Sequence, residues 1–219
     1  MNRMQLLLFL LLVVPSLHAS ECSPTGQSIA QEGWSSALRR VCLRDSTSKN
    51  VFSSPDGQKA LVAEQGGFSL TIRAKKVAWA EGKQFGPAGS EISWSPTSSA
   101  FFINYGDGSG LDGWTIHVFS IRGSEVVDHP DVNGRIVQSF RNQIRCPKDA
   151  VDPNVRGLGW SRDGSLLFAF AQRTVSEPCE VQGDFRGAVV TVSDGSLREF
   201  YSETEAKAHF HDRLPYNMR

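Results

Sequence analysis

The chain has 219 residues, 40% of them hydrophobic, and it carries 23 basic residues (Lys and Arg) against 23 acidic ones (Asp and Glu). This charge balance lacks the electrostatic footprint of a nucleic-acid-binding protein and offers no basic patch for an anionic membrane. The length suits one domain with a sizeable core.

The first twenty residues have the pattern of a secretory signal peptide. Arg3 precedes an apolar run over residues 6–14, which small and polar residues follow. This run is about nine residues long, whereas a membrane-spanning helix needs roughly 20, so the pattern favours a cleaved leader over an anchor. We therefore expect cleavage near Ala19 or Ser20, a secreted or periplasmic protein, and no transmembrane segment after cleavage.

Four cysteines remain in the mature chain, which we expect to be a single β-rich domain over residues 21–219: Cys22, Cys42, Cys146 and Cys179. An even number in an exported protein favours disulfides over free thiols or metal ligands. Of the three pairings that four cysteines allow, we expect Cys22–Cys42 and Cys146–Cys179, because shorter loops cost less entropy to close. Lipid attachment at Cys22 is less favoured, since acidic Glu21 precedes it.

One helix is predicted near the N-terminus, over Gln27–Leu43, from the partly helical spacing of its apolar residues. A second place for a short helix is the polar segment 127–155, which has one apolar patch at Ile136, Val137 and Phe140. The rest of the chain favours strands, because Gly and Pro separate short runs of branched and aromatic residues about every ten positions. These runs are "ALVAEQ", "FSLTIRA", "KVAWA", "AFFINYG", "WTIHVFSI", "SLLFAFAQ", "AVVTVSD" and "LREFYS". The predicted fold is all-β.

Three stretches, residues 50–64, 91–105 and 157–171, repeat one pattern. When Ser54, Ser95 and Ser161 are aligned, a strand precedes each serine, a tight polar turn follows it, and a second strand comes next. Pro and Asp at the turns favour tight turns, and Gly accepts a positive φ. Each stretch is therefore predicted to be a β-hairpin. We interpret four residues as structural parts of these hairpins: Trp94, Trp160, Asp56 and Asp163.

This Trp-Ser-Pro-Asp-Gly pattern followed by a strand resembles the repeat of TolB-like β-propellers and, more distantly, WD-type repeats. The first two copies are about 41 residues apart, which is the length of a four-stranded blade. The resemblance implies a small or incomplete propeller-like array of antiparallel hairpins. In such families the repeats mostly build scaffolds, so it also implies recognition of a partner rather than a reaction. A twisted β-sandwich built from the same hairpins is the alternative.

The best candidate for a ligand-contacting loop is the glycine-rich segment "NYGDGSGLDGW", with Asp107, Asp112 and Trp114. Binding groups often lie on loops that a rigid sheet supports. The spacing of its acids does not match a calcium-binding EF-hand. His209 and His211 are expected to share a face of a terminal strand, without a third metal ligand at diagnostic spacing. Neither Ser35 nor Ser161 fits a hydrolase nucleophile motif. We therefore predict no catalytic residue, metal or cofactor.

The favoured function is a non-enzymatic binding or scaffold domain that recognises a macromolecular partner, a protein or envelope component, in the cell envelope or outside the cell. The alternative is an envelope enzyme or ligand-binding protein that acts on glycans or peptides through carboxylates on loops, such as Asp107, Asp112, Asp128 and Asp131. A secreted inhibitor or toxin-like protein would also fit the size and the cysteines. The basic cluster "RAKK" at 73–76 is explained as well by a solvated turn as by a ligand.

Overall fold

The computed structural model describes residues 31–32, 37–43, 47–77, 86–106, 113–144, 152–173 and 185–214. The predicted leader and Cys22 lie outside these residues. The described chain is mostly antiparallel β-structure with two helices, which confirms the all-β prediction. No helix among the described residues combines the length and apolar character that a membrane crossing needs.

Three separate antiparallel sheets contain the strands. The first sheet has the order β3 (Lys49–Ser53), β4 (Lys59–Glu64), β5 (Gly67–Ile72) and β6 (Lys75–Val77). The middle sheet has the order β1 (Gln31–Glu32), β2 (Arg39–Arg40), β7 (Glu91–Trp94), β8 (Ala100–Tyr105), β9 (Thr115–Arg122) and β10 (Glu125–Asp128). The third sheet has the order β11 (Asn154–Trp160), β12 (Leu166–Gln172), β13 (Phe185–Thr191) and β14 (Leu197–Tyr201).

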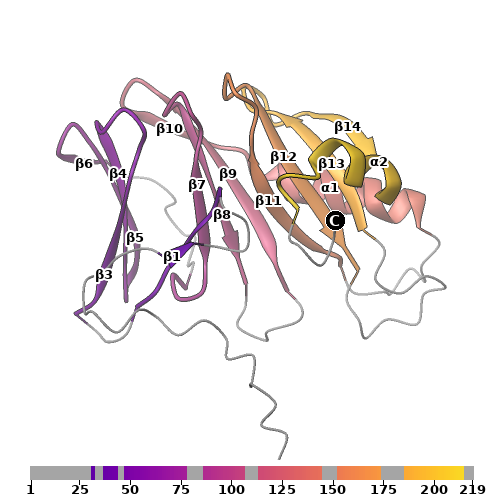
Figure 1. Cartoon of the computed structure of the whole chain (residues 1–219). Helices are drawn as coiled ribbons and strands as arrows, with labels where there is room; N and C mark the ends of the chain where they lie inside the picture. Colours follow the sequence, from indigo (N-terminus) through magenta and orange to yellow (C-terminus); the bar gives the residue numbers. More distant parts are fainter. Residues whose placement is uncertain are drawn as a thin grey trace, which may run out of the picture.

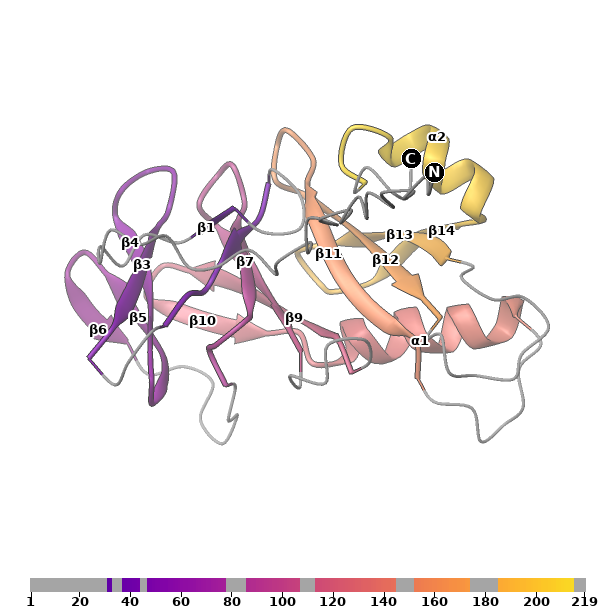
Figure 2. The same cartoon turned by 60° about the horizontal axis from the view of Figure 1, so that its bottom comes forward.

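The sheets stand side by side in chain order (Figures 1 and 2). One hydrophobic cluster joins the first and middle sheets, and a second joins the middle sheet to the third sheet and helix α1 (Asp131–Gln143). The middle sheet is therefore buried on both faces. On β8, Phe101 packs in the first cluster and its neighbour Phe102 in the second. This explains the continuous apolar run "AFFI", since neighbouring residues of a strand point to opposite faces.

One of the two helices was predicted from the sequence and the other was not. Helix α1 lies inside segment 127–155, as predicted, and buries Val132, Ile136, Val137 and Phe140 against the sheets. Helix α2 (Glu203–Phe210) was not predicted, and it lies on β13 of the third sheet. Ser202 caps its first turn by accepting a hydrogen bond from the Glu205 N–H, and the Glu205 side chain returns the bond.

The helix predicted over Gln27–Leu43 is wrong for the described residues, which contain strands β1 and β2 instead. Leu38 packs in the cluster between the middle and third sheets, whereas Val41 packs in the cluster between the first and middle sheets. Two residues three positions apart face opposite ways in an extended strand but the same way in a helix. The apolar spacing that favoured a helix thus belongs to an extended segment in which Leu38 and Val41 flank β2 and pack into different clusters.

A tight contact at Gly157 gives the first testable prediction. A Cβ atom added to this glycine would lie 2.6 Å from a ring atom of Phe102 and 2.9 Å from Ile116. We expect Gly157→Ala to lower the free energy of unfolding by about 1–3 kcal/mol, because the two sheets must separate to admit the methyl group. The measurement is urea denaturation followed by circular dichroism.

The matched control is Gly134→Ala in α1, where an added Cβ atom meets no atom within 4 Å. There the same substitution is expected to raise stability by up to about 1 kcal/mol, because alanine is the better helix former. Equal effects of the two substitutions would contradict the close approach of β8 and β11.

Candidate functional site

The hairpin turns after β3, β7 and β11 use the same hydrogen bonds at equivalent serines. Ser54, Ser95 and Ser161 each donate their backbone N–H to the carbonyl oxygen of the residue five positions later, at 2.8–2.9 Å. The N–H of that same later residue donates to the serine Oγ at 2.9–3.0 Å. The three serines therefore close three equivalent turns.

The two repeat aspartates belong to this turn chemistry. Asp56 accepts hydrogen bonds from the Ser54 hydroxyl and the Gln58 N–H, and Asp163 accepts them from the Ser161 hydroxyl and the Ser165 N–H. Hydrogen bonds to the charged form stabilise it. The Ser161 hydroxyl, followed by the Ser165 hydroxyl and N–H, lowers the pKa of Asp163 to about 2. The hydrogen bonds from Lys59 and Ser54 hold the pKa of Asp56 far below its usual range.

These lowered pKa values predict acid sensitivity of the turns. A carboxylate whose pKa is depressed in the folded state stabilises the protein above its unfolded pKa, and this stability is lost as the pH falls through the folded pKa. We expect the Asp163 contribution to disappear between about pH 4 and pH 2. We therefore expect the free energy of unfolding, measured by urea denaturation, to fall less between pH 5 and pH 2.5 in Asp163→Asn than in the parent chain. If the free energy of unfolding fell equally in both proteins, the ionised Asp163 carboxylate would not stabilise the turn.

Trp94 connects the middle sheet to the first sheet, and Trp160 connects the third sheet to the middle sheet. The Trp94 indole N–H donates to the carbonyl oxygen of Phe52 at 2.9 Å, and the Trp160 indole N–H donates to the Ser93 hydroxyl at 3.1 Å. The acceptors Phe52 and Ser93 stand two positions before Ser54 and Ser95, the aligned serines of their hairpins, so the two hydrogen bonds join equivalent positions. Trp160 is buried, and Trp94 is partly buried. Neither indole N–H is available for a ligand.

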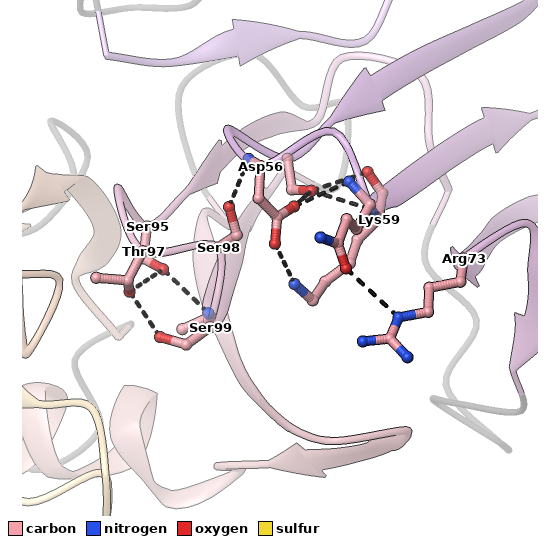
Figure 3. Close-up of polar contacts among 10 residues, drawn as sticks. Asp56, Lys59, Arg73, Ser95, Thr97, Ser98 and Ser99 are labelled. Carbon is pink, nitrogen blue, oxygen red and sulfur yellow. Dashed lines mark hydrogen bonds and ion pairs between the residues drawn. The ribbon is translucent and has the colours of Figure 1, made fainter.

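The turns of the first and middle sheets meet beside a cleft of about 710 Å³. The Ser98 hydroxyl of the middle sheet accepts a hydrogen bond from the Asp56 N–H at 2.9 Å, which holds the two turns together (Figure 3). We call this space the basic cleft and define it by its lining residues: Gln58, Lys59, Ile72, Arg73, Lys75, Lys76, Val77, Thr97, Ser99, Ile121, Gly123 and Ser124.

Four cations line the basic cleft, and none of its described lining residues is acidic. Lys59 pairs with Asp56 at 2.7 Å, and the Arg73 Nε lies 3.4 Å from the Gln58 side-chain oxygen (Figure 3). Lys75 and Lys76 are exposed and form no ion pair with a described residue. The middle sheet contributes Thr97, Ser99 and Ser124 to the lining, and the Thr97 and Ser99 hydroxyls are hydrogen-bonded to each other at 2.7 Å (Figure 3).

The turn that carries Arg73 has an unusual backbone. Arg73 and Ala74 have φ values of 49° and 63°, both in the left-handed region that side chains normally avoid. Two successive positive φ angles suit the two-residue hairpin between β5 and β6, where Asn-Gly is the usual choice. The sequence thus places an arginine and an alanine in a strained turn at the edge of the basic cleft.

Of the ligand-contacting loop predicted from the sequence, the described residue Trp114 is not among the lining residues of the basic cleft. Asp107 and Asp112 lie outside the described residues. The Arg156 guanidinium carbon lies 3.4 Å from the centroid of the Trp114 ring. The same ring is close to Gly106, because a Cβ atom added to this glycine would lie 2.9 Å from a ring atom of Trp114. Burial, with a smaller contribution from Arg40, lowers the pKa of Arg156 to about 10, and Glu91 opposes this shift. Trp114 is therefore half-buried, with its ring covered on one face by Arg156.

The remaining candidate residues lie apart from one another. Asp131 opens α1 and lies 3.9 Å from Arg135, whereas Asp128 ends β10; neither lines the basic cleft. The terminal strand predicted for the histidines is wrong, because His209 lies in α2 and stacks on Tyr201, and His211 follows the helix end. A short helix places these two side chains differently from a strand. No group of three His, Cys, Asp or Glu side chains in the described ranges could hold a metal ion.

Of the four cysteines, only Cys42 is described. It is not a free thiol, and the Asn50 side chain pairs with both its backbone N–H and its carbonyl oxygen. Cys22, Cys146 and Cys179 lie outside the described residues, so the two pairings stay predictions.

The basic cleft could not be predicted from the sequence, because only its basic residues on the β5–β6 side form a cluster in the chain. From the sequence, a solvated turn or edge explains the cluster "RAKK" as well as a ligand does, and nothing there places Thr97, Ser99 and Ser124 beside it. A scan against protein-family models and a search of curated proteins found no match to this chain.

Proposed function

We propose that this chain is an exported, non-catalytic binding domain of propeller-like architecture that recognises a macromolecular partner through the basic cleft. The observation that carries the proposal is the composition of the cleft. It gathers four cations and three hydroxyl groups around a space of about 710 Å³, in a chain whose total charge is balanced. Cavities of this size are typical of ligand sites.

The propeller-like part of the proposal has its own support. Each of the three sheets contains a four-stranded antiparallel meander, and the meanders follow one another side by side. The indole links from Trp94 and Trp160 run between equivalent positions of successive sheets. Stacked meanders with one repeated contact are what a blade repeat requires.

The non-catalytic part is favoured by how the described carboxylates are used. Asp56 and Asp163 accept hydrogen bonds within their own turns, and Asp131 lies beside Arg135. Because their pKa values are depressed, the two turn carboxylates are ionised at neutral pH, so they cannot act as general acids, and they are too weakly basic to be effective general bases. The carboxylates that the enzyme alternative needs most, Asp107 and Asp112, lie outside the described residues.

Site-specific photo-crosslinking in the producing cells tests this proposal. A benzophenone amino acid at Ser124, in the cleft, is compared with one at Glu203, on helix α2 at the third sheet. We expect a discrete covalent adduct from position 124 only, and its loss when Lys75 and Lys76 are changed to alanine. The same adduct from both positions, no adduct, or an adduct that survives the lysine changes would overturn the proposal.

A further inference from the structure

We infer that the basic cleft binds an extended acidic peptide segment that also carries an apolar side chain. This inference rests on the proposed function, because it names the class of partner for the same cleft. It follows from four properties of the lining residues: their charge, their apolar part, their hydroxyl groups, and the absence of aromatic rings among the described ones.

Charge selects an anionic ligand. Asp56 neutralises one of the four lining cations, Lys59. A second acidic residue, Glu125, follows the cleft residue Ser124 in the sequence, lies in β10 of the middle sheet, and is not itself in the lining. Lys75 and Lys76 stay exposed on β6, and Arg73 is held beside them by the Gln58 amide. An excess of positive charge therefore remains at the β5–β6 side. A concave surface of one charge sign attracts ligands of the opposite sign and aligns them.

The apolar part of the lining favours a peptide over a simple anion. Ile72 and Ile121, each 9% exposed, come from the first and the middle sheet, and Val77 is partly buried beside them. A phosphate or sulfate group gains nothing from such a surface. Since Ile72 and Ile121 are largely buried already, a leucine or valine side chain between two carboxylates would pack mainly on the half-buried Val77, while its acidic neighbours reach the lysines.

The absence of aromatic side chains among the described lining residues disfavours single-stranded nucleic acids. Proteins that bind single strands stack the bases on aromatic rings. The cleft is instead lined by Thr97, Ser99 and Ser124. The Thr97 and Ser99 hydroxyls bond each other at 2.7 Å, and a hydroxyl has one donor and two acceptor sites, so this pair and the Ser124 hydroxyl keep hydrogen-bonding capacity for a peptide backbone or carboxylates.

Fluorescence anisotropy with labelled probes tests the ligand class. The main probe is a peptide of three Asp-Leu-Glu-Gly copies. The comparison probes replace its acids with lysine or its leucines with glycine, and a twelve-residue oligothymidine and a sulfated oligosaccharide represent the other anions. We expect the main probe to bind, the lysine probe to show no binding, the glycine probe to bind several-fold more weakly, and the affinity of the main probe to fall with added salt.

The decisive variant reverses the two exposed lysines, Lys75→Glu with Lys76→Glu. Its matched control, Lys49→Glu with Lys207→Glu, changes the total charge equally but lies on β3 and α2. We expect the dissociation constant of the main probe to rise about tenfold or more in the cleft variant and to stay within about twofold in the control. Lys75→Arg with Lys76→Arg should retain binding, and unchanged thermal melting would show that each variant is folded.

Several outcomes would overturn the inference. Tighter binding of oligothymidine or the sulfated oligosaccharide than of the main probe would assign the cleft to another anion. Equal losses in the cleft variant and the control would reduce the effect to total charge. No binding of the main probe, together with a photo-crosslinked adduct from position 124, would remove the acidic peptide but leave the proposed function standing.

Discussion

Replacing Asn104 with alanine is expected to lower the free energy of unfolding by about 3–5 kcal/mol, because three hydrogen bonds at a fully buried site would be lost. Asn104, on β8, donates to the Gly157 carbonyl oxygen at 3.0 Å and accepts from the Gly157 N–H at 2.7 Å, so its amide joins the middle sheet to β11. It also donates to the buried Glu91 carboxylate at 3.2 Å. Alanine would leave these buried polar groups without their partner.

Asn142→Ala is the matched control for this experiment. Asn142 lies on the exposed side of α1, where it accepts a hydrogen bond from Gln138 at 2.9 Å. Its replacement is expected to change stability by less than about 0.5 kcal/mol. Urea denaturation at pH 7 measures both variants. A loss below about 1 kcal/mol for Asn104→Ala would contradict the view that this amide links the two sheets.

Replacing Trp160 with alanine is expected to cost about 3–5 kcal/mol of stability. The ring is 7% exposed, lies 5.3 Å from the Phe102 ring between centroids, and donates its N–H to the Ser93 hydroxyl. Alanine would leave a large cavity between the middle and third sheets as well as an unpaired hydroxyl. Thermal and urea denaturation measure the loss.

Two further variants separate the packing of Trp160 from its hydrogen bond. Ser93→Ala removes only the acceptor and should cost about 1 kcal/mol, and the double variant should cost less than the sum of the single ones. Trp94→Ala, at the equivalent position of the middle sheet, should cost less than Trp160→Ala because Trp94 is more exposed. A larger loss at Trp94 would contradict the expectation that the more deeply buried of the two equivalent rings contributes more to stability.

The all-β class, the strand runs and the hairpin turns could be predicted from the sequence because their causes are local. Alternating apolar residues in β9 define its two faces: Ile116 and Val118 pack toward the third sheet, and Phe119 and Ile121 toward the first. The turn residues Asp56 and Asp163 satisfy backbone groups two positions away. Interactions over two to five residues leave a pattern that one sequence can reveal.

The N-terminal strands, the role of Trp114 and the basic cleft depended on contacts between distant segments. β2 is a strand because β7 pairs with it. Its apolar flanking residues, Leu38 and Val41, pack in two different hydrophobic clusters. The predicted loop tryptophan is held by Arg156, 42 positions later. The basic cleft combines "RAKK" with hydroxyl groups from the next sheet. The sequence by itself determined the strands and turns, whereas the packing of sheets decided which polar side chains face one space, because such contacts leave no local period in the chain.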